Sequence, residues 1–565
     1  MLSFIVLLPL LVCAILLFVP HRQAKLFKIA TLLTTATQLS ASCWAYFKFE
    51  TGKKTAAISQ EAAYQLVEKL EWIRLDLGSF GQLSIDYFIG VDGVSISMIL
   101  LSAIVMFMGA IASWNIQQKQ KGYFLLYLLL SSSVPGCFVA LDFFLFYLFF
   151  EFMLLPMYFL IGIWGGVRRE YASIKFFIYT LVGSLFILVV MIALYNATID
   201  PAKTAVQLKL ANETSQVTPE MVANVQQQLA SNGIAAKDQV HTFSMLHMMD
   251  QSNYVTNAAI GVKSSASWWG YSLRFWAFLA LFIGFAIKLP VVPVHTWLPD
   301  AHVEAPTAIS VVLAGILLKV GGYGLIRIAY SIFPDMALSF AVITGFLGML
   351  SIIYGALNAL AMTDLKKMIA YSSVSHMGFV LIGLASFTAE GINGAVFQMF
   401  SHGILSALLF LLVGVLYDRT HDRSIGNYRG LLSKMPYYGV FVMIGFFASL
   451  GLPGFSGFIG ELFTILGGFA SPYLPVWIVV VSTFGIVLGA AYFLWTLQRM
   501  FLGKYWVKND LEWSPQLQNL DPREWVMLVS LSLLALITGI FPGLLFQPLT
   551  DTVNELVNHL TTFMK

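Results

Sequence analysis

The chain has 565 residues, of which 58% are hydrophobic and only 11% are charged, and its formal net charge is +3. This composition excludes a soluble globular domain, and the weak net charge gives no basis for nucleic-acid binding. The sequence has no GxGxxG or P-loop motif, and its three cysteines, Cys13, Cys43 and Cys137, stand singly without CxxC spacing. We therefore expect no flavin, nicotinamide, ATP, iron–sulfur or other metal site in the chain itself.

Apolar stretches long enough to cross a bilayer recur along the chain. A bilayer core of about 30 Å requires about 20 apolar residues per helical crossing, and these stretches are continuously apolar rather than alternating, so they predict helices and not barrel strands. The predicted spans are 2–20, 27–46, 93–114, 122–140, 142–164, 173–195, 272–294, 305–327, 337–361, 367–386, 391–417, 435–470, 475–499 and 524–546. We therefore predict an all-α membrane protein with about fourteen transmembrane helices, the twelfth of them broken.

The distribution of lysine and arginine predicts the orientation of the spans. No basic residue precedes the apolar stretch 2–20, so we interpret it as a retained span rather than a signal peptide. With the N-terminus outside, the short basic loops face inward, as the positive-inside rule requires. These loops carry Arg168, Arg169, Lys366, Lys367, Arg419, Arg423, Arg429 and Lys434, whereas Arg327 and Lys565 fall on the outer side. We therefore expect a bacterial inner-membrane protein with both termini outside.

Two polar segments, 47–92 and 196–271, interrupt the spans on the outer side. In the second, the stretch HTFSMLHMMD with His241 and His247 has the residue types of a metal site, but a packing amphipathic helix is the favoured interpretation. In the tail, Leu556, Val557 and Leu560 are spaced to share one face of a helix on the membrane surface. We predict four parts: N-terminal spans in 1–121, a first repeat in 122–330, a second in 331–505, and a last span with a surface helix in 506–565.

Ionisable residues within the predicted spans are the main functional signal, because burying a charge in a bilayer costs about 2.5 to 3.5 kcal/mol on insertion scales. Glu151 lies in the middle of an apolar run, and a structural ion pair is its alternative explanation. Lys288 directly precedes LPVVPVH, where prolines break the helix, and its alternative is to extend to the interface. Lys319 lies in SVVLAGILLKVGGYG, where Gly315, Gly321 and Gly322 permit close packing.

Three more ionisable residues follow in the second half. His376 and His402 each lie within an apolar span and either relay protons or only hydrogen-bond a neighbouring helix. Glu461 closes GLPGFSGFIGEL, where glycines and Pro453 interrupt the twelfth span much as Pro290 interrupts the seventh. Broken helices in both halves are typical of transporters in which two structural repeats each supply an unwound ion site. We predict a proton path through these residues, with Glu151 controlling the protonation of Lys288.

The inward segment HTWLPDAHVEAPT combines His295, Asp300, His302 and Glu304. A metal site is the less favoured interpretation, because Pro299 and Pro306 indicate a loop and a restarting helix for which Asp300 is a candidate cap and Glu304 a partner of the helix dipole. The two histidines are candidate secondary relays that admit protons from the inner side.

Four stretches resemble a known family: FFEFMLLPMYFLIGIWG, IKLPVVPVHTWLPDAHVEAPTAISVVLAGILLKVGGYG, DLKKMIAYSSVSHMGF and GLPGFSGFIGE. They are similar to the proton-conducting membrane transporter family of complex I and of Mrp-type antiporters. The resemblance covers about residues 120 to 500. Within the family, a glutamate at position 461 resembles the M-type branch, whereas the L and N types carry lysine there.

The resemblance implies a fourteen-helix core with two inverted five-helix repeats broken near Pro290 and Pro453. It implies that Glu151 and Lys288 form a coupled pair, that Lys319 is the central relay, and that Glu461 is the terminal group. The residues His376 and His402 match histidines of the polar axis that connects them. The polar insertions 47–92 and 196–271 depart from the family pattern.

The resemblance also implies a non-redox subunit of a proton-translocating NADH:quinone oxidoreductase. NADH, FMN, iron–sulfur clusters and quinone are then expected in partner subunits, with the L and N types as neighbours. Three alternatives stay open: a sodium/proton antiporter subunit of the Mrp kind, the membrane subunit of a proton-pumping hydrogenase, and a passive scaffold without transport.

Overall fold

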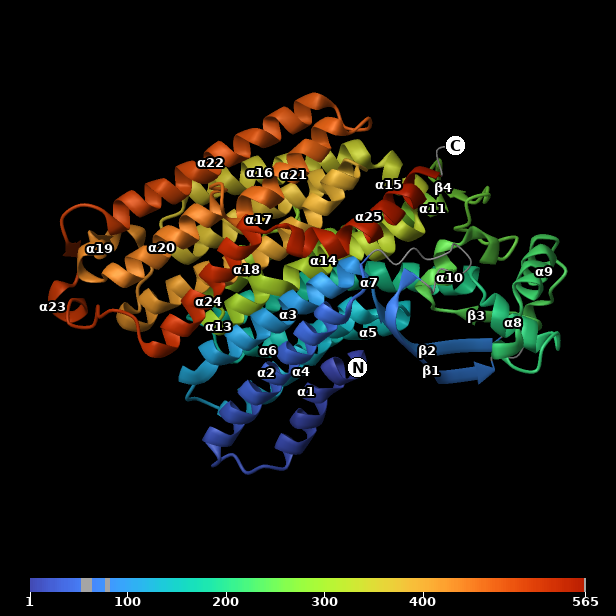
Figure 1. Ribbon diagram of the computed structural model, residues 1–565, viewed down its shortest axis with the longest axis horizontal. Helices are drawn as coiled ribbons and strands as arrows, with labels where there is room; N and C mark the ends of the chain where they lie inside the picture. The colour runs from blue at the N-terminus through green and yellow to red at the C-terminus, as the bar shows by residue number, and fades with distance from the viewer. Residues whose placement is uncertain (52–62, 77–81, 563–565) are drawn as a thin grey trace.

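The computed structural model describes residues 1–51, 63–76 and 82–562, and within these the apolar segments form a long helical bundle (Figure 1). The first half contains α1 (Leu2–Leu17), α2 (Ala24–Lys48), α3 (Gly93–Ala112), α4 (Gln120–Val139), α5 (Phe143–Phe152), α6 (Leu154–Trp164), α7 (Arg169–Ala197), α11 (Leu273–Lys288), α12 (Trp297–Glu304), α13 (Thr307–Val312) and α14 (Leu318–Gly324). The second half contains α15 (Pro334–Ser339), α16 (Ala341–Ala361), α17 (Leu365–Ala385), α18 (Ala389–Thr420), α19 (Leu431–Lys434), α20 (Pro436–Ser449), α21 (Ser456–Ala470), α22 (Val476–Phe501), α23 (Asp510–Trp513), α24 (Pro522–Ile540) and α25 (Gly543–Thr562). Each of the fourteen predicted spans coincides with one of these helices or with a consecutive series of them, so the predicted helical membrane fold is confirmed.

Both predicted helix breaks are present. The seventh span stops at Lys288 and resumes as α12 at Trp297, and the twelfth stops at Ser449 and resumes as α21 at Ser456. The prolines and glycines between the halves remove backbone donors or adopt turn conformations, so the helix cannot continue through them. Gly451 has φ +81° and Gly454 φ +100°, which only glycine adopts without strain.

The spans differ strongly in how far the protein itself covers them. In the helix that runs from α13 through α14, every residue of the most apolar stretch is buried inside the protein, and the same is true of α18. In α7 and α22 only 39% of that stretch is buried. Helices that are apolar but uncovered by protein are those that face lipid. The innermost helices of the bundle are therefore those that carry Lys319 and His402.

Two π-helical turns, at Leu313–Leu317 and Leu325–Tyr330, flank α14 and were not predicted. Such turns widen the helix locally and shift its hydrogen-bonding register, and they occur frequently at functional sites. The predicted end of this span at residue 327 is too early, because the helix continues through Tyr330.

The glycines around Lys319 pack as predicted. A β-carbon at Gly321 would lie 2.6 Å from the backbone nitrogen of Leu289, and one at Gly315 would lie 2.7 Å from a methyl of Val105. We expect Gly321→Val to destabilise the protein by about 1 to 3 kcal/mol, because the side chain would push α14 away from the break that follows Lys288. The measurement is the unfolding temperature of the purified protein. An unchanged value would mean that the helices do not need this close approach.

The two polar segments form a small sheet together, which the sequence did not predict. Strands β1 (Gln65–Asp76) and β2 (Gln82–Val91) pair antiparallel, and β3 (Val240–Thr242) from the second segment joins β2 in parallel. Short helices α8 (Pro201–Gln207), α9 (Pro219–Ala230) and α10 (Met245–Met249) pack beside it (Figure 1). Two further two-stranded pairs join β4 (Ser267–Trp268) to β5 (Tyr271–Ser272) and β6 (Tyr428–Arg429) to β7 (Trp506–Val507). The parts of 47–92 at residues 52–62 and 77–81 lie outside the described residues.

The favoured interpretation of HTFSMLHMMD as one amphipathic helix is wrong for its first part. His241 lies on β3, where its ring Nδ1 is 3.1 Å from the carbonyl oxygen of Tyr195, and only α10 is helical. Sheet pairing with β2, which is distant in the sequence, overrides the local helical pattern here. His247 on α10 lies 3.6 Å from Asp200. Burial on its own raises the pKa of Asp200, but the charge of His247 and its hydrogen bond lower that pKa below its usual range.

The chain ends on α25, which runs across the bundle and packs against α3 and α18. Leu560 is buried on its inner face and Leu556 and Val557 are half-buried there, as the spacing predicts. The N-terminal ammonium of Met1 contacts Glu68 of β1, and the end of α25 lies beside α15 (Figure 1). Both described ends of the chain therefore lie on the side of the bundle that carries the sheet. Residues 563–565, including Lys565, lie outside the described residues.

Candidate functional site: a buried row of ionisable side chains

Lys319 and His402 lie in direct contact at the centre of the bundle. The ammonium nitrogen of Lys319 is 2.8 Å from Nδ1 of His402 and also donates to the backbone oxygen of Ala314, which belongs to the first π-helical turn. Lys319 is fully buried, and His402 is 5% exposed. An amine and an imidazole at hydrogen-bond distance can exchange a proton without rearranging the backbone.

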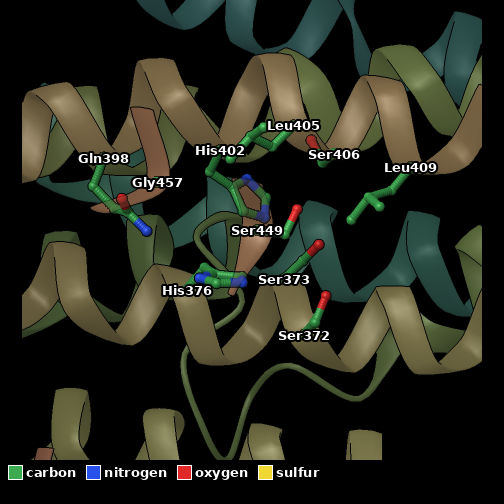
Figure 2. Close-up of a pocket in the computed structure, with 10 residues that line it drawn as sticks. All are labelled: Ser372, Ser373, His376, Gln398, His402, Leu405, Ser406, Leu409, Ser449 and Gly457. Atoms are coloured by element: carbon green, nitrogen blue, oxygen red, sulfur yellow. The ribbon is translucent and has the colours of Figure 1, made fainter. Parts of the chain in front are cut away.

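His376 extends this contact across to the broken twelfth span. Its ring lies 5.7 Å from that of His402 between centroids, and its Nδ1 is 3.1 Å from Oε1 of Glu461. Figure 2 shows the two rings facing each other from α18 and α17, with the hydroxyls of Ser373 and Ser449 beside them. These side chains line a cavity of about 10 Å³, which has room for about one water molecule. A water molecule can bridge polar groups at this distance.

The row thus reads Lys319, His402, His376 and Glu461, and its members come from four helices, α14, α18, α17 and α21. The sequence named all four residues, but neither their order nor their contacts could be predicted from spacing. Glu461 is 4% exposed and begins α21's second turn, just after the break. A buried carboxylate beside an imidazole is an arrangement in which protonation of one group changes that of the other.

Glu151 and Lys288 lie in the same region but form no direct ion pair. The ammonium nitrogen of Lys288 lies over the rings of Phe150 and Phe176, 5.1 and 5.6 Å from their centroids, and has no hydrogen-bond partner among the described residues. Oε1 of Glu151 also has none there. Lys288 is 1% exposed, whereas Glu151 is only partly buried, two residues before the irregularity at Met153 that separates α5 from α6. Their coupling stays a prediction.

His295 and His302 are both buried, and neither ring forms a hydrogen bond with a described residue. His295 lies edge-on to Tyr354, with centroids 5.2 Å apart, and His302 stacks on Phe410 at 4.6 Å. The charges of Lys366 and Lys319 act on His302 through space, without a hydrogen bond to either.

The roles expected for the two carboxylates of this segment are wrong. Asp300 lies inside the first turn of α12 rather than capping a helix, and it forms a 2.7 Å ion pair with Lys175. Glu304 is the last residue of α12, and it accepts a hydrogen bond of 2.9 Å from the backbone nitrogen of Arg168, the N-cap of α7, so its carboxylate lies at the start of α7 and not of the helix that restarts after Pro306. The reason is that α12 begins earlier than Pro299 indicates, since proline is tolerated in the first helical turn.

Two buried cations were not predicted from the sequence. Arg327 is predicted on the outer side, but the structure buries it. It contacts Asp92 at the N-terminus of α3 and donates hydrogen bonds to the hydroxyls of Tyr64 (2.6 Å) and Tyr323 (3.2 Å). Lys319, Tyr323 and Arg327 are spaced four apart, the helical signal that could have identified it. Lys366 is predicted in a loop on the inner side, but it is the second residue of α17 and only 4% exposed.

Comparison with known proteins places the chain. The family model described as "NADH:quinone oxidoreductase/Mrp antiporter, TM" matches residues 140–234 and 238–489, more than half of its length. The chain belongs to this family.

Curated relatives of this family member include proteins named subunit M. It is 39% identical over 498 residues to "NADH-quinone oxidoreductase subunit M" of Rhodobacter capsulatus, covering 88% of this chain and 84% of the relative. It is 35% identical over 562 residues to the subunit of that name from Rickettsia bellii, covering 98% of each chain. These relatives confirm the M-type branch that Glu461 predicted.

Solved structures of the family share its fold. A chain of "Respiratory complex I from Thermus thermophilus with bound NADH" superposes with a TM-score of 0.76 at 27% identity, covering 99% of this chain and all of that one. A chain of the "Mrp complex from Dietzia sp. DQ12-45-1b" superposes with a TM-score of 0.72 at 20% identity, covering 98% and 97%, and shows a common fold alone.

Proposed function

We propose that this chain is the M-type, antiporter-like subunit of a respiratory complex I and that it translocates protons through its buried ionisable row. The observation that carries the proposal is the contact series from Lys319 through His402 and His376 to Glu461. A structural scaffold gains nothing from four buried ionisable groups on four helices, because each lowers stability unless it is paired.

In this function the chain does no redox chemistry. Its residues hold and pass protons, while NADH oxidation, FMN, the iron–sulfur clusters and quinone belong to partner subunits. The partners would include other antiporter-like membrane subunits, with the L and N types as neighbours. The lipid bilayer surrounds the exposed faces of helices such as α7 and α22.

The proposed orientation determines which end of the row faces which side of the membrane, and we propose transport from the inner to the outer side. The basic loops lie at the end of the bundle opposite the sheet, and basic loops remain on the inner side of a membrane. Both termini and the sheet would then lie outside, and protons would enter near His295 and His302 and leave beyond Glu461. The two repeats, 122–330 and 331–505, would supply one broken helix each.

A residue-level test uses Glu461→Gln, which keeps the side chain's shape but removes its exchangeable proton. In the whole complex reconstituted in liposomes, we expect the proton-pumping rate to fall about tenfold or more, because the last group of the row can no longer accept and release a proton. Pumping is measured by the quenching of a pH-sensitive dye during quinone reduction.

Glu390→Gln is the matched control, since Glu390 is exposed in the first turn of α18 and should pump normally. Normal pumping by Glu461→Gln would favour the scaffold alternative. Identification of the co-purifying chains distinguishes the alternatives at the level of the assembly. Nickel–iron subunits would indicate a hydrogenase, and the absence of any peripheral redox subunit would favour an Mrp antiporter.

A further inference from the structure

An open pocket of about 400 Å³ lies at the inward end of the bundle, between the α6–α7 loop, the end of α12 and the start of α17. Its walls carry Arg168, Glu304, Lys366, Tyr417 and Arg423. A water occupies about 30 Å³ in the liquid, so a pocket of this size and polarity holds several water molecules. It therefore brings the inner aqueous phase to the side chain of Lys366.

Lys366 is the one lysine of this pocket, and it is unusual among the pocket's charged groups in having no carboxylate partner. Arg168 lies 3.9 Å from Glu304, and Arg423 lies 3.2 Å from Asp364. Lys366 instead donates to a single backbone oxygen, that of Ala305, at 2.5 Å, and forms no ion pair with any carboxylate of the described residues. Glu304, Asp364, Asp418 and Arg423 act on it only at longer range.

A buried ammonium without a counter-ion is costly, and losing its proton removes that cost. Lys366 therefore differs from the paired arginines around it, which remain charged because a guanidinium does not release its proton in proteins. It combines contact with the aqueous pocket and the chemistry needed to give a proton away.

His302 does not line the pocket. Its imidazole is completely buried, both ring nitrogens lack a hydrogen-bond partner among the described residues, and both Lys366 and Lys319 act on it electrostatically. Ala305, which accepts the hydrogen bond of Lys366, follows His302 by three residues. The same lysine thus adjoins the pocket on one side and the segment that carries the imidazole on the other.

We propose that Lys366 is the residue that takes protons from the inner aqueous phase and passes them to His302, and through it to Lys319. The inference rests on the proposed proton translocation. The Lys366 ammonium gives one proton to a ring nitrogen of His302, directly or through one water, and becomes a neutral amine. The imidazolium passes that proton to the neutral amine of Lys319, and Lys366 takes a new proton from a hydronium ion in the pocket.

The experiment compares three substitutions of Lys366 in the whole complex in liposomes. Lys366→Met removes the proton carrier, Lys366→Arg keeps the charge but does not release a proton, and Lys366→His restores a group that exchanges protons. We expect the Met and Arg variants each to pump about tenfold more slowly, and the His variant to recover a substantial part of the rate. Lys367→Met, at the half-buried next position, should pump normally.

A pumping Arg variant would overturn the proposal, because it would mean that the pocket needs only a positive charge, as a site for an anionic lipid headgroup or free phosphate would. Normal pumping by Lys366→Met would overturn it too. Incorporation of each variant into the purified complex, measured by the amount of the chain, separates loss of pumping from loss of folding. If Lys319→Met also pumped normally, the proposed translocation itself would fail rather than this step.

Discussion

Replacing Lys319 with methionine is expected to lower the proton-pumping rate about a hundredfold, the range that a positioned proton donor contributes. Lys319 is the first group of the row, and its ammonium contacts His402 directly. Methionine has a similar length and fills the same space, so the packing around α14 should survive. Protein interiors tolerate an apolar side chain in place of a buried charged one, because the apolar side chain needs no ion-pair or hydrogen-bond partner.

Two further variants make this test specific. Lys319→Arg keeps a positive charge that is not released, so it should pump as poorly as the methionine variant if proton exchange matters rather than charge. Lys508→Met, at an exposed lysine that directly follows β7, should behave like the unchanged protein. A Lys319→Met complex that pumped at the normal rate during quinone reduction would exclude Lys319 from the path.

The second large effect is on stability. We expect Arg327→Met to lower the free energy of unfolding by about 3 to 5 kcal/mol, because it leaves the carboxylate of Asp92 buried without its cation. Asp92 is 3% exposed, and Arg327 is the cation that contacts it. Tyr64 and Tyr323 would also lose their donor to this guanidinium. The measurement is the thermal unfolding of the purified protein and the amount of assembled complex.

The control is the double substitution Asp92→Asn with Arg327→Met. Asparagine keeps the cap that Asp92 provides to the backbone nitrogen of Ser95 at 2.9 Å, but it carries no charge. The double variant should therefore recover part of the lost stability, because the effects of substitutions at two residues in direct contact are not additive. If both variants were equally unstable, the charge of Asp92 would not be the cause.

Lys319 and Arg327 lie in different parts of one helix, the series from Thr307 to Tyr330. Lys319 is the second residue of α14, just after the first π-helical turn, and Arg327 lies within the second π-helical turn. Lys319 contacts a histidine and a backbone oxygen, whereas Arg327 contacts a carboxylate. The first arrangement allows a proton to leave and the second holds a charge in place, which is why we assign transport to one and stability to the other.

The sequence by itself determined the spans, the two helix breaks and the identities of the main buried ionisable residues. These features are local: a run of apolar residues must become a helix in lipid, prolines and glycines end it, and a charge in such a run is visible without any knowledge of its neighbours. The glutamate at position 461 was also enough to choose the M-type branch, and the relatives agree.

Only the tertiary structure decided which of these residues meet. Contacts from Lys319 to His402 and from His376 to Glu461 join residues more than eighty positions apart, and they depend on how α14, α17, α18 and α21 pack. The same holds for the sheet that unites β2 and β3, for the pairing of Arg327 with Asp92, and for the burial of Lys366. Hydropathy fixes which segments enter the membrane, but the close approach of helix backbones fixes which polar side chains lie within reach of one another.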